Sequence, residues 1–183
     1  MRRNRIMKKL LVLLFLTITI MLSAQTYKQS AGLVLGSFNG FSYKTFMSEN
    51  VALQADLGFG LLATQGSIGL VGYKGLVYGV EHHWSFHFNP NLYYQKTFHE
   101  ENWGDISAFV GGGVSLGLAS EFYNSKVFGK WGFNAIAGIE FSLDDAPFTF
   151  GLDFRPGYEM MFGHGIYGNF FDWAIAASAR YTF

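Results

Sequence analysis

The sequence predicts an all-β protein, a single antiparallel barrel of eight strands that crosses a membrane. Several stretches alternate bulky apolar residues with small or polar ones at every second position, whereas an amphipathic helix needs a period near 3.6 residues. Glycine (23 residues) and aromatic residues (19%) are abundant while proline (3 residues) is scarce, which is unlike a disordered chain or a helical bundle. The chain also begins with an apolar segment typical of exported proteins.

The first 24 residues have the three parts of a secretory signal peptide. Five basic residues precede an apolar run from Leu10 to Leu22, and Ser23 and Ala24 supply small residues for cleavage after Ala24. The alternative is a retained membrane anchor, but this run is short for a helix that needs about 20 residues to span a bilayer. We therefore expect a signal peptide over residues 1–24 and one barrel domain over residues 25–183.

Removal of the signal peptide leaves eight basic and 13 acidic residues, a net charge of −5. No basic patch remains to attract nucleic acid, so no nucleic-acid partner is expected. The chain has no cysteine, which excludes disulfides, cysteine metal sites and a lipid-modified N-terminal cysteine. An exported chain does not meet the cytosolic nucleotide pool, so its glycine-rich stretches predict no cofactor site.

The C-terminal stretch shows the alternation most clearly. From Trp173 to Phe183 every second residue is bulky or apolar, and the residues between them are small or charged. The same pattern recurs over residues 51–61, 131–143 and 148–155. Less regular stretches over residues 31–38, 41–47, 91–98 and 105–118 bring the expected strand count to eight. A central strand has no place for proline, so Pro90 should end one strand, with residues 76–88 lying above the membrane or in an outer loop.

The segments between these strands differ in length. Residues 48–50, 99–104 and 144–147 are short and polar, whereas residues 64–75, 120–130 and 160–171 are longer and richer in glycine and aromatic residues. Short periplasmic turns and long outer loops are typical of membrane barrels, and an even strand count places both termini in the periplasm. The outer aromatic residues are expected to form an interfacial belt or, alternatively, a ligand-binding rim: Tyr158, Tyr167, Phe170 and Phe171.

The same alternation would suit a soluble β-sandwich or a lipocalin-type barrel, which hide aromatic residues inside. The volumes of the two faces distinguish these alternatives. An eight-stranded barrel has an interior just wide enough for side chains to fill it. The bulky face is too large for that space, whereas the glycine, alanine and serine face fits it, so the bulky face should contact lipid.

The chain ends in Arg180-Tyr181-Thr182-Phe183, which resembles the C-terminal strand recognised by the outer-membrane assembly machinery. Residues 129–143 and 148–162 resemble the penultimate strands of small OmpX-like and OmpA-like barrels, and Ser-Ala-Gln at the cleavage site resembles the Bacteroidetes type. The resemblance implies a protein of the Gram-negative outer membrane, surrounded by lipid and lipopolysaccharide. It also implies that Tyr181 and Phe183 form the signal for the barrel assembly machinery.

The expected inward face carries three basic and three acidic residues, Lys44, Arg155, Arg180, Asp56, Glu140 and Asp153. An unpaired charge in a narrow, dry lumen is costly. We therefore predict that these residues form a hydrogen-bonded charge network that plugs the lumen. Arg155 and Arg180 should lie at its centre, since arginine binds carboxylates through two parallel N–H groups. The alternative is a small porin-like pore lined by these charges.

Residues 81–87 form the one chemically suggestive cluster. His83 and Ser85 share a strand face, as a base and a nucleophile could, and Glu81 on that face could orient the histidine. This resembles barrel hydrolases that trim lipid A, but Phe86 stands where that family commonly has asparagine, and the expected register turns Ser85 away from lipid. His83 and His87 lie about 13 Å apart along a strand, too far to share a metal. The sequence thus favours a structural or surface-interaction protein that is not an enzyme, with lipid A hydrolysis as the alternative.

Overall fold

The chain forms one continuous antiparallel sheet. The computed structural model describes residues 27–37, 39–61, 66–71, 76–78, 83–101, 103–121, 127–163 and 166–183. Its strands are β1 (Gln29–Gly36), β2 (Asn39–Phe46), β3 (Val51–Leu61), β4 (Gly66–Val71), β5 (Leu76–Tyr78), β6 (His83–Glu101), β7 (Gly104–Glu121), β8 (Val127–Leu143), β9 (Phe148–Gly163) and β10 (Ile166–Thr182). Within these ranges no helix is long and apolar enough to span a bilayer.

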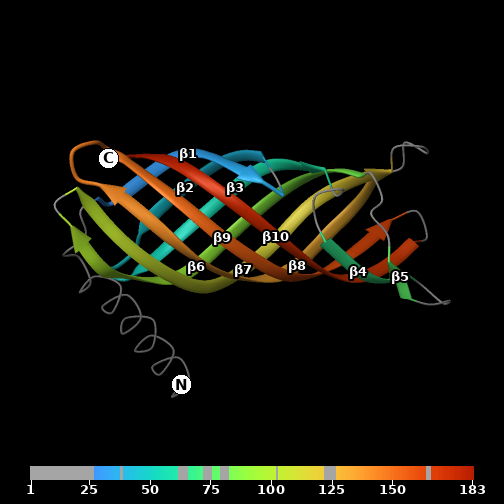
Figure 1. Cartoon of the computed structure of the whole chain (residues 1–183). Coiled ribbons are helices and arrows are strands. Elements are labelled where there is room, and N and C mark those ends of the chain that lie inside the picture. Colours follow the sequence, from blue (N-terminus) through green and yellow to red (C-terminus); the bar gives the residue numbers. More distant parts are fainter. Residues whose placement is uncertain are drawn as a thin grey trace, which may run out of the picture.

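Eight of these strands close into a barrel in the order β1-β2-β3-β6-β7-β8-β9-β10, because β10 pairs back onto β1 (Figure 1). The closing ladder runs from Ser30 opposite Thr182 to Gly36 opposite Ala176. Every neighbouring pair in the barrel is antiparallel, and the start of β1 lies beside the end of β10. The predicted fold class, an eight-stranded antiparallel up-and-down barrel, is confirmed. The end that carries both of these strand ends is called the lower end below.

Strands β4 and β5 form a hairpin that pairs beside β10 rather than within the eight-strand ring. β1 and β2 have only 8 residues each, whereas β10 has 17, so the upper part of β10 extends beyond β1. β4 pairs with that part, from Trp173 opposite Gly66 to Gly168 opposite Val71. An unpaired strand edge exposes backbone donors and acceptors. The hairpin therefore satisfies backbone groups of β10 that the short β1 cannot reach.

Pro90 does not end a strand, and the expectation that the strand begins at residue 91 is wrong. β6 runs without interruption from His83 to Glu101 and pairs Pro90 with Ala55 of β3. On its other side the β6–β7 ladder passes from Phe88 opposite Leu116 to Asn91 opposite Gly113, leaving out residues 89 and 90. Proline lacks a backbone N–H, and Pro90 stands at a position that the β6–β7 ladder leaves unpaired.

The upper strands also extend further than the sequence suggested. β9 continues to Gly163 and β10 begins at Ile166, so residues 160–171 are mostly a hairpin rather than a long loop. Residues 64–75 contain β4, and β8 begins at Val127 within the expected loop 120–130. Tyr158 and Phe171 are exposed on β9 and β10, while the side chains of Tyr167 and Phe170 lie outside the described part.

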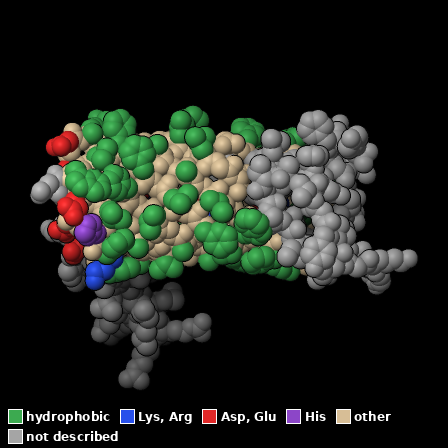
Figure 2. All heavy atoms as spheres, viewed as in Figure 1, with side chains coloured by type: hydrophobic (Ala, Val, Ile, Leu, Met, Phe, Trp, Pro, Cys, Tyr) green, Lys and Arg blue, Asp and Glu red, His purple; other side chains and the backbone are tan. Residues whose placement is uncertain are grey.

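Large hydrophobic side chains cover the outside of the barrel. β10 alternates without exception from Phe171 to Tyr181, with odd positions exposed and even positions buried. Exposed leucine, isoleucine, phenylalanine, tyrosine or tryptophan side chains occur on every one of the eight barrel strands. On the face drawn in Figure 2 they spread over the barrel wall, whereas charged side chains gather at the lower end. The predicted assignment of the bulky face to the exterior is confirmed.

The interior is mixed rather than uniformly small and polar. An apolar cluster of Ala52, Tyr93, Phe109 and Ile136 is buried inside the barrel. Inward glycines make room for the larger side chains. A Cβ added to Gly111 would lie 2.4 Å from the Tyr93 Cβ, and one added to Gly138 would lie 2.5 Å from the Phe109 Cζ.

Alanine substitution at two adjacent glycines of β7 tests this packing. At Gly111 an added methyl meets the Leu92 carbonyl oxygen at 2.2 Å as well as Tyr93. Gly111→Ala should therefore lower the free energy of unfolding by about 1–3 kcal/mol, as overpacking does. Gly112→Ala would meet one backbone atom below 3.0 Å, the Asn134 oxygen at 2.9 Å, with the next contact at 3.9 Å. It should cost less than Gly111→Ala, since alanine also reduces unfolded-chain entropy. Urea unfolding in detergent micelles measures both, and equal costs would contradict the packing described.

Candidate functional site

The buried charges of the lumen form three groups at successive heights. The lower cluster consists of Lys44, Glu140 and Arg180, contributed by β2, β8 and β10. Lys44 Nζ lies 2.5 Å from Glu140 Oε1, and Arg180 Nη1 lies 3.1 Å from Glu140 Oε2. All three side chains are buried. One carboxylate therefore uses both oxygens to hold two cations, which gives the cluster a net charge of +1.

Neutral polar groups complete the lower cluster. Lys44 Nζ also donates to Gln95 Oε1 and to the Tyr27 hydroxyl, at 2.8 Å each. The Tyr27 hydroxyl donates in turn to Glu140 Oε1 at 2.5 Å. Burial and the charge of Glu140 raise the pKa of Tyr27, so the phenol remains a neutral donor. The residue two positions before β1 thus closes the network from the lower end.

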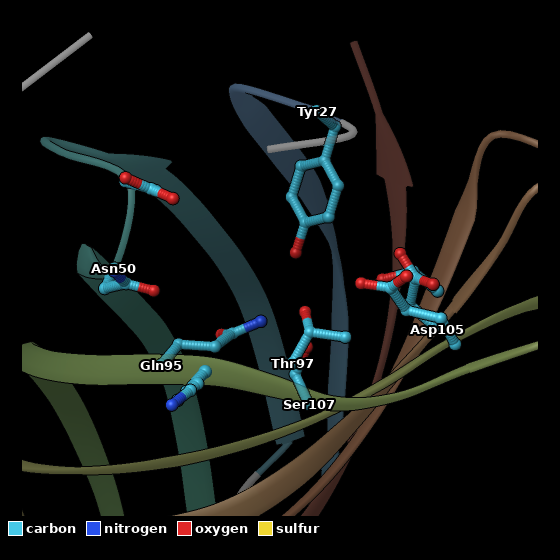
Figure 3. Close-up of a pocket in the computed structure, with 10 residues that line it drawn as sticks. Tyr27, Asn50, Gln95, Thr97, Asp105 and Ser107 are labelled. Carbon is cyan, nitrogen blue, oxygen red and sulfur yellow. The ribbon is translucent and has the colours of Figure 1, made fainter. Parts of the chain in front are cut away.

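A hollow of about 580 Å³ lies at this end of the barrel, beside Tyr27. Figure 3 shows the Tyr27 ring entering the space between Gln95, Thr97 and Asp105. Glu49, Glu100 and Asp105 line this hollow together with Lys96. It is an open, polar mouth whose inner end is occupied by the lower cluster.

The middle cluster is built around Arg155 of β9. Its Nε and Nη2 donate to the two oxygens of Asp153 at 2.5 and 2.9 Å, and its Nη1 donates to Asp56 Oδ2 at 2.6 Å. Gln54 donates to Asp56 and accepts from the Tyr93 hydroxyl at 3.0 Å. Two carboxylates and one guanidinium give this cluster a net charge of −1.

The upper cluster pairs Lys130 of β8 with Glu159 of β9. Lys130 Nζ lies 2.8 Å from Glu159 Oε2, and Ser115 Oγ donates to Glu159 Oε1 at 2.6 Å. Sequence reasoning missed this pair because it ended β9 at residue 155 and treated residues 120–130 as a loop. The alternation of the two strands could have predicted this pair, because residues an even number apart on a strand face the same side. Lys130 is two residues before the inward Gly132, and Glu159 is four after the inward Arg155.

The six charged residues singled out in the sequence are all buried and paired, but in two clusters rather than one. Arg180 bonds Glu140 and the Ser42 hydroxyl, whereas Arg155 bonds Asp56 and Asp153. Within the described part of the chain, the ion pairs of the two arginines involve different carboxylates. The two clusters meet at Tyr93 instead, whose hydroxyl donates to Gln54 and whose ring centroid lies 5.7 Å from Lys44 Nζ.

Of the three candidate catalytic residues, the structure describes the side chain of Ser85 alone. Glu81 lies outside the described residues, and so does the side chain of His83. Ser85 is fully buried inside the barrel, where its hydroxyl bonds the ring of the buried His87. No group of three or more histidine, cysteine or acidic side chains suited to a metal ion occurs in the part of the chain that is described.

The C-terminal aromatic residues lie on the exterior at the lower end. Tyr181 and Phe183 are 50% and 59% exposed, and the Tyr181 ring packs edge-on against Phe148. The backbone of Phe183 exchanges hydrogen bonds with Gln29 at 2.9 and 3.2 Å. The last residue therefore takes part in closing the barrel while its side chain stays outside.

These features define a closed eight-stranded barrel with an apolar exterior and paired charges inside. No protein-family model matches the chain, and no curated protein matches it significantly. Among solved structures, it is similar to Ail, the attachment invasion locus protein of Yersinia pestis, with 14% sequence identity and a TM-score of 0.31 over 84% of this chain and 93% of that one. The strand pairing and the side chains of the chain itself define its class.

Loss of the carboxylate of the lower cluster should destabilise the barrel far more than loss of an exposed carboxylate. Glu140→Gln leaves Lys44 and Arg180 buried without a counter-charge and should lower the free energy of unfolding by about 3–5 kcal/mol. Glu101→Gln is the matched control, because Glu101 forms a 3.0 Å ion pair with His99 that is exposed, and should cost less than about 1 kcal/mol. Urea unfolding in micelles compares the two, and similar losses would show that the lower cluster does not stabilise the barrel.

Proposed function

We propose that this protein is an integral β-barrel of the bacterial outer membrane with a structural or surface-interaction role and a lumen plugged by its charge clusters. The observation that carries the proposal is the inverted distribution of side chains. Large phenylalanine, leucine and isoleucine side chains cover the exterior, while the buried side chains include two lysines, two arginines and two glutamates. Soluble proteins rarely expose continuous apolar surface of this extent. A closed barrel in lipid satisfies every backbone polar group without water.

The two ends of the chain support the outer membrane over other membranes. The predicted signal peptide over residues 1–24 directs export, and the resemblance of the final strand to an assembly signal assigns Tyr181 and Phe183 to recognition by the barrel assembly machinery. In this proposal the lower end, with its short turns and charged rim, faces the periplasm. Lipid and lipopolysaccharide surround the apolar band.

The plug is supported by how the lumen is filled. An eight-stranded barrel leaves little bore once side chains occupy it. The lower and middle clusters join side chains from opposite walls of the ring, as in the Arg155–Asp56 pair between β9 and β3, whereas the upper cluster joins the neighbouring strands β8 and β9. A selective pore would favour charges of one sign, whereas both signs are interleaved in this lumen. We therefore propose neither transport nor catalysis for this chain, and Ser85 in particular is enclosed rather than directed at lipid.

Membrane insertion predicts heat-modifiable migration on gels. Folded protein from the outer-membrane fraction should resist SDS at room temperature and migrate differently after boiling, because its hydrogen-bonded ring stays closed. Leu152→Arg, which places a charge on the exposed apolar face of β9, should lower stability in vesicles by about 2–4 kcal/mol. Asp145→Arg in the exposed turn after β8 is the control and should change little. Recovery of the processed protein as a soluble species would contradict the proposal.

The plugged lumen predicts that the protein conducts no ions across planar bilayers. Purified protein should give no stable, large channels, since three layers of paired side chains occlude the lumen. A variant with Asp56, Asp153 and Arg155 all replaced by serine removes every charge of the middle cluster. It should show increased open-channel conductance relative to the unmodified protein. Stable, large openings from the unmodified protein would defeat the plug.

A further inference from the structure

A small chamber lies inside the barrel between the middle and upper clusters. It has a volume of about 30 Å³, and its walls include Asn89, Ser115, Asn134, Gly157, Glu159 and Asp172. A space of this size holds one or two water-sized particles, since a single one needs about 10–15 Å³. Its lining is polar, and we call it the upper chamber.

The upper chamber carries an excess negative charge. Glu159 is neutralised by Lys130 at 2.8 Å, and Arg155 on the opposite side is occupied by Asp153 and Asp56. Asp172, which is 6% exposed, has no basic side chain paired with it among the described residues. One carboxylate is thus left over in a place where a lone charge is costly.

The asparagine amides beside the chamber leave their oxygens without donors. Asn134 Nδ2 donates to Asn91 Oδ1 at 2.6 Å, and Asn91 Nδ2 donates to the Asn89 backbone oxygen at 3.1 Å. The side-chain oxygens of Asn89 and Asn134 are buried and have no hydrogen-bond partner. Asn89 is only 8% exposed and lines the chamber. Acceptors therefore collect at this point of the lumen.

Gly157 keeps the space between these oxygens open. It lies opposite Asn134 on β8 and opposite Asp172 on β10. A Cβ at this position would lie 2.9 Å from Asp172 Oδ1, 3.3 Å from the Phe133 backbone oxygen and 3.5 Å from Asn134 Cβ. A carboxylate oxygen and a carbonyl oxygen thus converge over the glycine, beside the asparagine.

We propose that the upper chamber binds a single monovalent metal cation such as Na⁺, with Asp172, Asn134, Asn89 and the Phe133 carbonyl as its oxygen donors. Hard cations take carboxylate and carbonyl oxygens as ligands. One excess carboxylate matches one positive charge, and the volume admits one small ion. The proposal concerns the folded barrel in any medium and does not depend on where the protein resides in the cell.

The test compares thermal unfolding of the refolded protein in micelles in NaCl and in choline chloride at equal ionic strength. Choline is too large for the chamber, so only Na⁺ should raise the midpoint Tm. At ten times the Kd the rise should be roughly 3–6 °C, because a ligand that binds only the native state stabilises it by mass action. Asp172→Asn should abolish the difference between the salts, and so should Gly157→Ala, which fills the space but retains the carboxylate. Asp144→Asn, an exposed turn residue, should leave the difference intact.

Three outcomes would overturn the proposal. They are equal Tm values in both salts, a salt difference that survives Asp172→Asn, and a Tm that rises with micromolar Ca²⁺ or Mg²⁺ but not with Na⁺. The first would point to a proton rather than a metal ion on Asp172. If Asp172→Asn does not fold, ²³Na NMR on the unmodified protein decides the matter. Line broadening that K⁺ competes away, but choline does not, supports the site, and its absence rejects it.

Discussion

The structure depends on the pairing of β1 with β10, because this ladder turns a sheet with two edges into a ring without them. Closure fixes two environments at once. Outside, alternate residues of every strand form an apolar band. Inside, eight strands leave a space that side chains fill, so any charge placed there must find a counter-charge among the facing strands. Glu140 between Lys44 and Arg180, and Arg155 between Asp153 and Asp56, are the result.

The glycines of β7 provide the space inside the ring that the long side chains of neighbouring strands occupy. Its inward positions include Gly111, Gly113 and Gly117, which face Tyr93, Asn91 and Lys130 respectively. A Cβ at Gly113 would lie 2.4 Å from Asn91 Oδ1, and one at Gly117 would lie 3.0 Å from Lys130 Cε. The many glycines of β7 weaken its signal as a strand. They suit the fold for the same reason, because they leave room for long side chains from β6 and β8.

The sequence predicted the ring, the exterior face and six buried charges because all three follow from a period of two, which local residues fully specify. It did not predict the extent of the upper strands, where Glu159 lies beyond the most apolar part of β9. The sequence also did not predict how the charges are grouped, since Arg180 of β10 reaches past β9 to Glu140 of β8 and not along a strand. The prediction at Pro90 was wrong for a related reason. Whether a missing backbone N–H disrupts a strand depends on the neighbouring strand, and the β6–β7 ladder leaves residue 90 unpaired.

The clusters are coupled through their charges even where they share no ion pair. The lower cluster has one positive charge in excess and the middle cluster one negative, and Tyr93 lies between them, in contact with Lys44 through its ring and with Gln54 through its hydroxyl. Their opposite charges attract across a medium of low polarity, where such attraction is strong. The upper cluster is neutral by itself, so the charge of Asp172 beside it has no such neighbour to balance it. The order of charges along the lumen therefore separates a lower half, whose excess charges offset each other, from an upper half in which Asp172 has no basic partner among the described side chains.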